Sequence, residues 1–142
     1  MKYRHLLASV ITMLAAPAFA TAPISGKWLT TERDSIIEIG HCDDARGGSL
    51  CGKVAHVFKM GDDGKAMLDF HNPATELRTR SIQGINVLTE LADSGSDWRG
   101  KIYDPKSGKS YKSIVTRNPD GTLLVQGCVS FICKSFVWTP AR

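Results

Sequence analysis

After its first twenty residues the sequence has no long apolar run. The earlier run, residues 6–16, is shorter than the ~20 residues that a membrane-spanning helix needs. Lys2 and Arg4 precede it and Ala18-Phe19-Ala20 follow it, which is the three-part pattern of a secretory signal peptide. We therefore expect cleavage after Ala20, no membrane span, and a single mature domain over residues 21–142 that is periplasmic or secreted.

Blocks of like charge are also missing. The chain has 18 Lys and Arg against 14 Asp and Glu, a net charge of +4, and two of these cations lie in the leader. The remaining charges of both signs are interspersed. Because nucleic-acid-binding domains usually concentrate Lys and Arg on one face, we expect no nucleic-acid partner.

The sequence contains neither Cys-x-x-Cys nor His-x-His. Its four cysteines are an even number in a chain with a leader, which predicts two disulfides. Three pairings are open. We favour Cys42 with Cys51 and Cys128 with Cys133, because each pair brackets a short segment between apparent strands. The alternative is a zinc site that combines these thiolates with His41. We expect disulfides, no metal and no cofactor.

No long segment has apolar residues at helical spacing, whereas several short segments alternate. In residues 98–103 the cations share one face, which places Trp98, Gly100 and Ile102 on a buried face. Ile85, Val87, Thr89 and Leu91 alternate in the same way. Turn sequences containing Pro and Gly separate such runs. Strands are predicted near residues 26–31, 35–40, 50–58, 85–91, 97–103, 109–117, 122–128 and 134–139.

About eight short antiparallel strands with tight turns form either a sandwich or a closed up-and-down barrel. Glycines inside the predicted strands favour the strong bending of a barrel. The stretch from 61 to 84 has weak periodicity, and we predict a short helix or an irregular insertion there. Segments of this length without strands are often functional.

A set of motifs runs along nearly the whole mature chain in a fixed order. Together they resemble the DUF2147 family of small exported bacterial proteins. This resemblance implies an all-β, lipocalin-like (calycin-type) barrel and no established activity. The two cysteines near the C-terminus depart from the glycine- and arginine-containing strand of many members, so contacts at that end are not carried over. The motifs are Gly26-x-Trp28-Leu29-Thr30, Ile37-Glu38-Ile39, Leu50-Cys51-Gly52-Lys53-Val54, Asp69-x-x-Asn72-Pro73, Leu77-Arg78-x-Arg80, Gly84, Trp98-x-Gly100-x-Ile102-Tyr103-Asp104-Pro105, Gly108-Lys109-x-Tyr111 and Trp138.

The strongest candidate site is a polar cluster just outside the predicted strands. An arginine fork binds a carboxylate or phosphate, and Asp or Asn side chains orient it. Alternatively, the cluster is a solvated loop held by local hydrogen bonds. Aromatic residues either fill the core or line a ligand cavity. The candidate ligand-binding residues are Asp69, Asn72, Arg78, Arg80, Tyr103, Tyr111 and Trp98.

Two functional classes remain open from the sequence. The first is a non-enzymatic module that binds a small amphipathic or anionic ligand or a cell-envelope protein. The second is a periplasmic hydrolase with Asp69 or His71 as general base. The chain has no Gly-x-Ser-x-Gly and no His-Glu-x-x-His motif, so no nucleophile or metal-dependent centre is identified for it. We favour the binding module.

Overall fold

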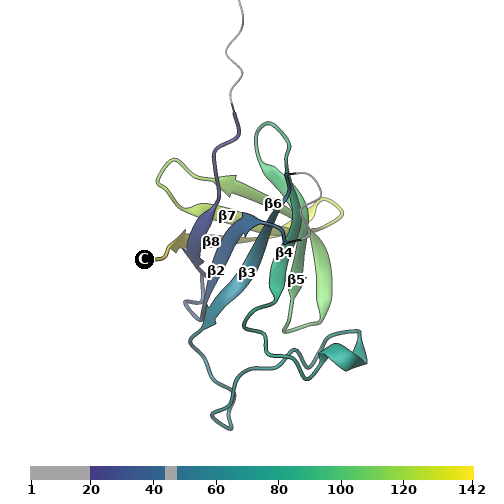
Figure 1. The fold of residues 1–142 in the computed structure, drawn as a ribbon. Helices are drawn as coiled ribbons and strands as arrows, with labels where there is room; N and C mark the ends of the chain where they lie inside the picture. The colour runs from purple at the N-terminus through teal and green to yellow at the C-terminus, as the bar shows by residue number, and fades with distance from the viewer. Residues whose placement is uncertain (1–19, 44–47) are drawn as a thin grey trace, which may run out of the picture.

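The protein is an eight-stranded antiparallel barrel with one long excursion at one end (Figure 1). The computed structural model describes residues 20–43 and 48–142, so residues 1–19 of the predicted leader lie outside the described residues. All eight predicted strands are present, with ends within about two residues of the prediction. The strands are β1 Gly26–Leu29, β2 Ser35–His41, β3 Leu50–Val57, β4 Asn86–Asp93, β5 Trp98–Asp104, β6 Lys109–Arg117, β7 Leu123–Val129 and β8 Ile132–Pro140.

Each strand pairs with the next along the chain, and β8 returns to β1 to close the barrel. The closing ladder is short, with Trp28 opposite Pro140 and Leu29 opposite Thr139. Closure pairs the two strands that would otherwise be sheet edges. The predicted all-β, up-and-down, lipocalin-like barrel is therefore confirmed. No helix within residues 20–43 and 48–142 is long and apolar enough to span a membrane.

Alternation along the strands builds the core, as it should in a small barrel. In β2, Ile37 and Ile39 are buried while Glu38 is exposed. In β5, Trp98 and Ile102 pack against the core, which confirms the predicted buried face. Glycine is required once inside this wall, since a Cβ at Gly100 would overlap the backbone of Thr89 and Glu90 on β4.

Strand β4 departs from the simple alternation that its sequence suggests. Leu88, expected on the face opposite Val87, is fully buried. The register of β4 shifts against both neighbours, and Glu90 has a φ of 55°. Each irregularity adds a residue on one strand and so changes the face on which the next side chain lies. Ile85, Val87 and Leu91 are buried as predicted, but the predicted placement of Leu88 on the face opposite them is wrong.

Both favoured disulfides are present, and the described residues include no free cysteine. Cys42–Cys51 ties the end of β2 to the start of β3. Cys128–Cys133 is a pair directly across the β7–β8 hairpin. The latter lies within the strands and not between them, because β8 begins two residues earlier than predicted. Disulfides are typical of exported proteins.

The N-terminal segment before β1 closes one end of the barrel. Ile24 is fully buried, and its carbonyl oxygen accepts a 2.9 Å hydrogen bond from the Trp28 indole. The Arg117 guanidinium carbon stands 4.8 Å from the centroid of that Trp28 ring, in cation–π geometry. We call this the closed end.

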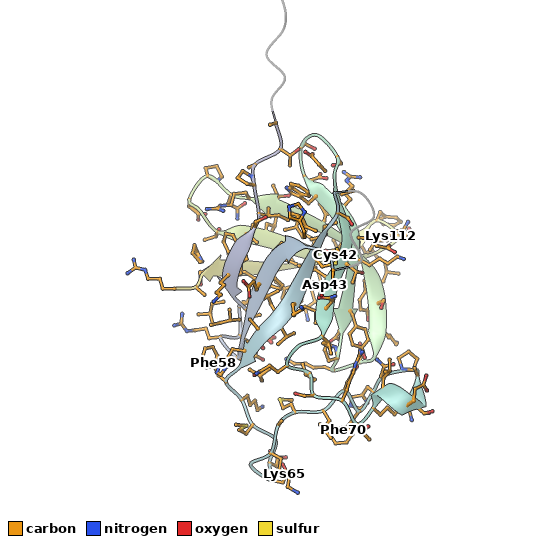
Figure 2. All side chains as sticks on the ribbon, viewed as in Figure 1. Cys42, Asp43, Phe58, Lys65, Phe70 and Lys112 are labelled. Carbon is orange, nitrogen blue, oxygen red and sulfur yellow. A yellow bond between two sulfur atoms is a disulfide. The ribbon has the colours of Figure 1, made fainter. Side chains whose placement is uncertain are left out.

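The opposite end carries the turns β1–β2, β5–β6 and β7–β8 and the long excursion between β3 and β4. We call the excursion, residues 58–85, the β3–β4 segment. It contains a short 3-10 helix, η1 Thr75–Leu77, and a bridge between Leu68 and Ser81. The predicted short helix or irregular insertion near 61–84 is confirmed. Figure 2 shows Phe58, Lys65 and Phe70 on this segment, away from the N-terminal end.

Candidate functional site

A cavity of about 510 Å³ opens at the end of the barrel opposite the closed end. Its wall is mainly aliphatic and aromatic, from strands all round the barrel and from the β3–β4 segment. Gly127 also lines the cavity, and a Cβ there would lie 3.3 Å from Ile102 Cγ2, so any larger side chain would crowd this wall. Apolar residues that line the cavity include Ile37, Val54, Val57, Met67, Ile82, Val87, Ile102, Val129, Ile132, Phe136 and Trp138.

Charged residues line this cavity as well, and they are Glu32, Asp34, Lys59, Asp104, Lys106 and Lys134. Lys106 Nζ lies 2.9 Å from Glu32 Oε2 and 3.9 Å from Asp34 Oδ2. Lys106 is on the β5–β6 turn, whereas both carboxylates are on the β1–β2 turn, four strands away round an eight-stranded barrel. The ion pair therefore bridges opposite sides of the opening. We call it the rim bridge.

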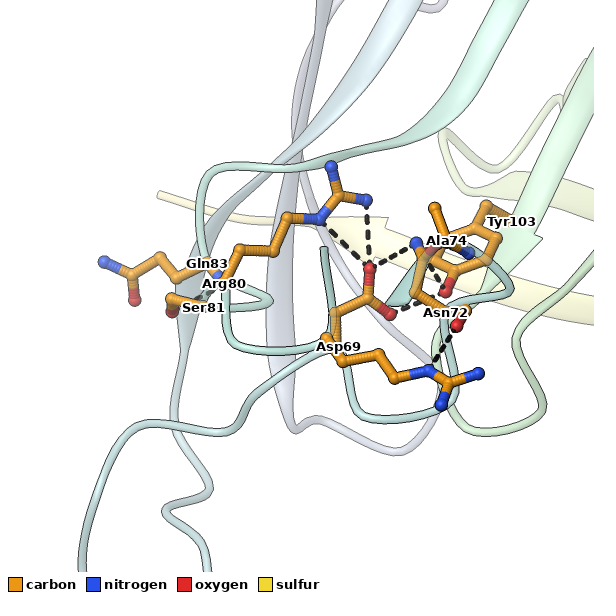
Figure 3. A network of polar contacts seen from close by, with 8 residues as sticks. Asp69, Asn72, Ala74, Arg80, Ser81, Gln83 and Tyr103 are labelled. Atoms are coloured by element: carbon orange, nitrogen blue, oxygen red, sulfur yellow. Dashed lines mark hydrogen bonds and ion pairs between the residues drawn. The ribbon is translucent and has the colours of Figure 1, made fainter. Parts of the chain in front are cut away.

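The polar cluster predicted from the sequence does assemble (Figure 3), and its member Tyr103 lines the cavity. Asp69 is fully buried, and its Oδ2 accepts hydrogen bonds from Arg80 Nε at 3.1 Å and Nη2 at 2.9 Å. Asn72 Nδ2 donates to the same oxygen at 2.8 Å. The Tyr103 hydroxyl donates to Asp69 Oδ1 at 2.6 Å. Four donor contacts thus satisfy one buried carboxylate.

The electrostatics of the cluster favour the carboxylate form of Asp69. Burial raises the pKa of Asp69, but the hydrogen bonds from Tyr103, Asn72 and Arg80 outweigh burial and hold it below the ordinary 3.8. Burial and the neighbouring Asp69 raise the pKa of Tyr103 to about 12. At neutral pH the pair is therefore a carboxylate with a protonated phenol, which suits a fixed hydrogen bond rather than proton transfer.

Tyr103 joins the cluster to the cavity. Its ring lines the cavity while its hydroxyl reaches Asp69 on the β3–β4 segment. The segment also packs on the β5–β6 turn, where a Cβ at Gly108 would overlap the carbonyl oxygen of His71. The cluster therefore fastens the β3–β4 segment to the barrel at the edge of the opening.

The other predicted residues fall in three places. Arg78 extends the cluster, since its Nε donates to the Asn72 carbonyl at 2.8 Å. Tyr111 lines the cavity. Trp98 does not join them: it begins β5, whose other end carries Tyr103, and its indole donates to the Ala22 carbonyl at 3.0 Å at the closed end. Alternation predicted the face of Trp98 correctly but carried no information on its height in the barrel.

The residues of the hydrolase alternative are differently placed. Asp69 is inaccessible and engaged by four donor contacts, and its lowered pKa disfavours uptake of a proton. His71 is exposed on the β3–β4 segment. Neither arrangement favours a general base.

Sequence reasoning missed much of the cavity wall and rim. Lys134 lines the cavity, with its Nζ 5.1 Å from the centroid of the Phe136 ring. The alternation Ile132, Lys134, Phe136, Trp138 was the available signal. It was overlooked because β8 was expected to start only at residue 134. The rim bridge had no sequence signal, because its partners are more than seventy residues apart.

A closed up-and-down barrel with an apolar cavity at one end defines the lipocalin-like class of structure. Residues 26–140 match the family described as "Uncharacterized protein conserved in bacteria (DUF2147)". The chain belongs to this family.

A solved structure described as "Protein HP1028 from the human pathogen Helicobacter pylori belongs to the lipocalin family" is similar to the chain. The two share 26% sequence identity with a TM-score of 0.70, over 86% of this chain and 85% of that one. No curated protein matches the chain.

Proposed function

We propose that this protein is a non-enzymatic binding module that holds a small amphipathic, anionic ligand in its barrel. The observation that carries the proposal is the cavity of about 510 Å³ with its apolar wall. Its size falls within the range of about 300–1,000 Å³ typical of small-molecule sites. Apolar volume left empty inside a small barrel costs packing energy, and a bound hydrocarbon chain recovers it.

Lys134 supports an anionic head on that ligand. Lys134 lines the cavity between Ile132 and Phe136, the alternate residues of β8 that face the same space. The sequence from Thr122 to Arg142 contains no Asp or Glu, so no acidic neighbour along β7 or β8 competes for its ammonium group. A ligand whose anionic head lies beside Lys134 would form an ion pair with it. The hydrocarbon chain of that ligand would be buried against the apolar wall of the cavity.

The compartment is part of the same proposal. The leader pattern of the sequence and the two disulfides support export to the periplasm. A carrier of an amphiphile through an aqueous compartment needs an enclosed apolar site of the kind described.

The test uses 11-(dansylamino)undecanoic acid, whose fluorescence rises in an apolar site, and its methyl ester as a neutral partner. We expect the acid to bind and Gly127→Leu, which fills the cavity, to weaken binding at least about tenfold. Ile102→Phe reduces the same volume from another strand and serves as a second variant. Gly40→Leu is the matched control, because no atom lies within 4 Å of a Cβ there.

Lys134→Gln separates the head from the chain. We expect it to weaken binding of the acid and to leave the ester unchanged. The function is refuted if the folded wild-type protein binds neither probe, or if both cavity-filling variants, folded by circular dichroism, bind as well as wild type.

A further inference from the structure

The tip of the β7–β8 hairpin exposes apolar side chains that the fold does not need. Val129 is 63% exposed, Phe131 91% and Ile132 70%. Val129 pairs with Ile132, so Ser130 and Phe131 form a two-residue turn. Such turns favour Gly, Asn and Asp, and a phenylalanine there gains nothing from folding. Contiguous exposed apolar residues of this kind mark interaction surfaces.

The tip is held rigidly in place. Cys128 and Cys133 are paired across the hairpin directly beneath Val129 and Ile132, and they are joined by a disulfide. A cross-link at this position restricts the conformations of the turn. The exposed side chains are thus held at a fixed position and lose little conformational entropy on binding.

On the two strands of the hairpin and on the adjacent β6 the charged residues beside the tip are lysines, whereas the acidic Glu32, Asp34 and Asp104 lie elsewhere round the same cavity. Lys112 on β6 pairs with Cys128, and Lys134 pairs with Gly127. Neither β6, residues 109–117, nor the chain from 122 to 142 contains an acidic residue. An apolar tip flanked by lysines matches the interface of an anionic bilayer, where side chains enter the headgroup region and cations remain at its surface.

We infer that the β7–β8 tip, residues 129–132, docks on an anionic phospholipid bilayer. A bilayer also fits the position of the tip. Val129 and Ile132 line the cavity as well as forming the tip, so a bilayer against the tip lies beside the opening. Docking does not rest on ligand binding, but the two together would bring the opening to the source of an amphiphile.

The experiment is co-sedimentation with vesicles. The protein is purified from cells that export it, after removal of the leader. Mass spectrometry verifies its N-terminus, because an uncleaved leader would bind lipid by itself. Vesicles contain equal parts of phosphatidylglycerol and phosphatidylcholine, or phosphatidylcholine alone. We expect binding to the anionic vesicles that weakens with added salt, and at least about tenfold less binding to the neutral ones.

Three variants locate the contact. Phe131→Ser is expected to weaken binding at least about tenfold, since it removes the most exposed apolar group. Lys112→Gln, on the outer face, is expected to weaken binding to anionic vesicles by a few fold. Val137→Thr is the matched control: Val137 is also exposed, at 46%, but lies along β8 away from the tip.

Further outcomes decide against the inference. The inference is overturned if the wild-type protein binds neither kind of vesicle or binds the neutral vesicles as well as the anionic ones. It is also overturned if Phe131→Ser binds the anionic vesicles as well as Val137→Thr does. A wild-type dimer that Phe131→Ser converts to a monomer, without vesicle binding, would assign the tip to protein contact. The dansyl probe, with Phe131→Ser, keeps the two proposals apart: unchanged probe binding with lost vesicle binding affects only docking.

Discussion

At the closed end of the barrel, Ile24 and the Trp28 indole fill the interior and Arg117 covers the ring, whereas at the other end a cavity of about 510 Å³ is left. Both ends are made from the same eight strands. The apolar segment before β1 covers the core at the closed end. The open end is bordered instead by polar contacts between turns. The closed end is therefore filled by apolar side chains, whereas the open end gives access to the cavity.

The difference teaches how a small barrel tolerates a cavity. Burial of large side chains contributes most of the favourable free energy, and the closed end contains the fully buried Ile24 and the nearly fully buried Trp28. The contacts at the open end join separate segments and keep the opening in shape. The variants below therefore separate stability from access, beginning with the largest expected effect.

Trp28→Ala should be the most damaging change. It removes a nearly fully buried indole together with its hydrogen bond to the Ile24 carbonyl. We expect the free energy of unfolding to fall by about 3–5 kcal/mol, as for other buried Trp-to-Ala changes. Urea unfolding followed by circular dichroism measures it. Phe131→Ala, at an exposed position, should stay within about 0.5 kcal/mol of wild type; similar losses for the two variants would contradict the assignment of the core.

Arg80→Ala should have an intermediate effect, because it leaves the buried Asp69 carboxylate without its cation. The Arg80 side chain is 39% exposed, so water partly replaces it, and we expect a loss of about 1–3 kcal/mol rather than the larger cost of a fully buried pair. Arg80→Lys retains the charge but not the two contacts from Nε and Nη2, and should cost less.

These two Arg80 variants also separate structure from binding. If the cluster only fastens the β3–β4 segment, stability falls while the dansyl probe binds as before in the folded protein. If Arg80 contacts ligand, Arg80→Lys keeps stability and loses probe. Equal stability and equal probe binding in all three proteins would show that the cluster has neither role.

The pH dependence of stability should report the same cluster. The pKa of Tyr103 is raised to about 12 from 10.0, so its contribution is complete below pH 10 and is lost as pH rises towards 12. The lowered pKa of Asp69 affects stability at acidic pH. Its contribution is present above pH 3.8 and is lost as pH falls through the folded-state value.

Differences between variants isolate these groups from the other titrating residues. The stability advantage of wild type over Tyr103→Phe should shrink between pH 10 and 12, and that over Asp69→Asn should shrink below pH 3.8. Thermal unfolding across both ranges measures each difference. A constant Tyr103→Phe difference up to pH 12 would show that the phenol is not held by Asp69.

The strands and disulfides were predictable because local patterns encode them, whereas closure of the barrel was favoured by the glycines and implied by the family resemblance. Alternation and turn residues locate strands, and cysteines close to each other in sequence at neighbouring strand ends are close in space. Leu88 was misplaced because a bulge depends on the fit between strands. Gly100, which leaves room for the β4 backbone near Glu90, gave no recognisable sign of that bulge.

The convergence of the polar cluster was predictable because its members are close in sequence. Asp69, Asn72 and Arg80 lie within one segment that returns on itself, so their convergence follows from chain connectivity. Lys134 was missed because β8 starts two residues earlier than predicted, whereas the rim bridge depends on which strands lie opposite one another. Trp98 shows the same limit, since a strand places its two ends at opposite ends of the barrel.

Lys106→Gln should have the smallest effect on stability and a selective effect on access. The rim bridge to Glu32 is exposed, and exposed pairs contribute at most about 1 kcal/mol. Because the bridge crosses the opening, its loss should raise the rate at which the dansyl probe leaves, measured by stopped-flow displacement. Lys101→Gln breaks a similarly exposed pair with Glu90 on the outer wall and is the matched control. Its probe exchange should match wild type, and equal acceleration in both variants would show that general loosening, not the bridge, controls exit from the cavity.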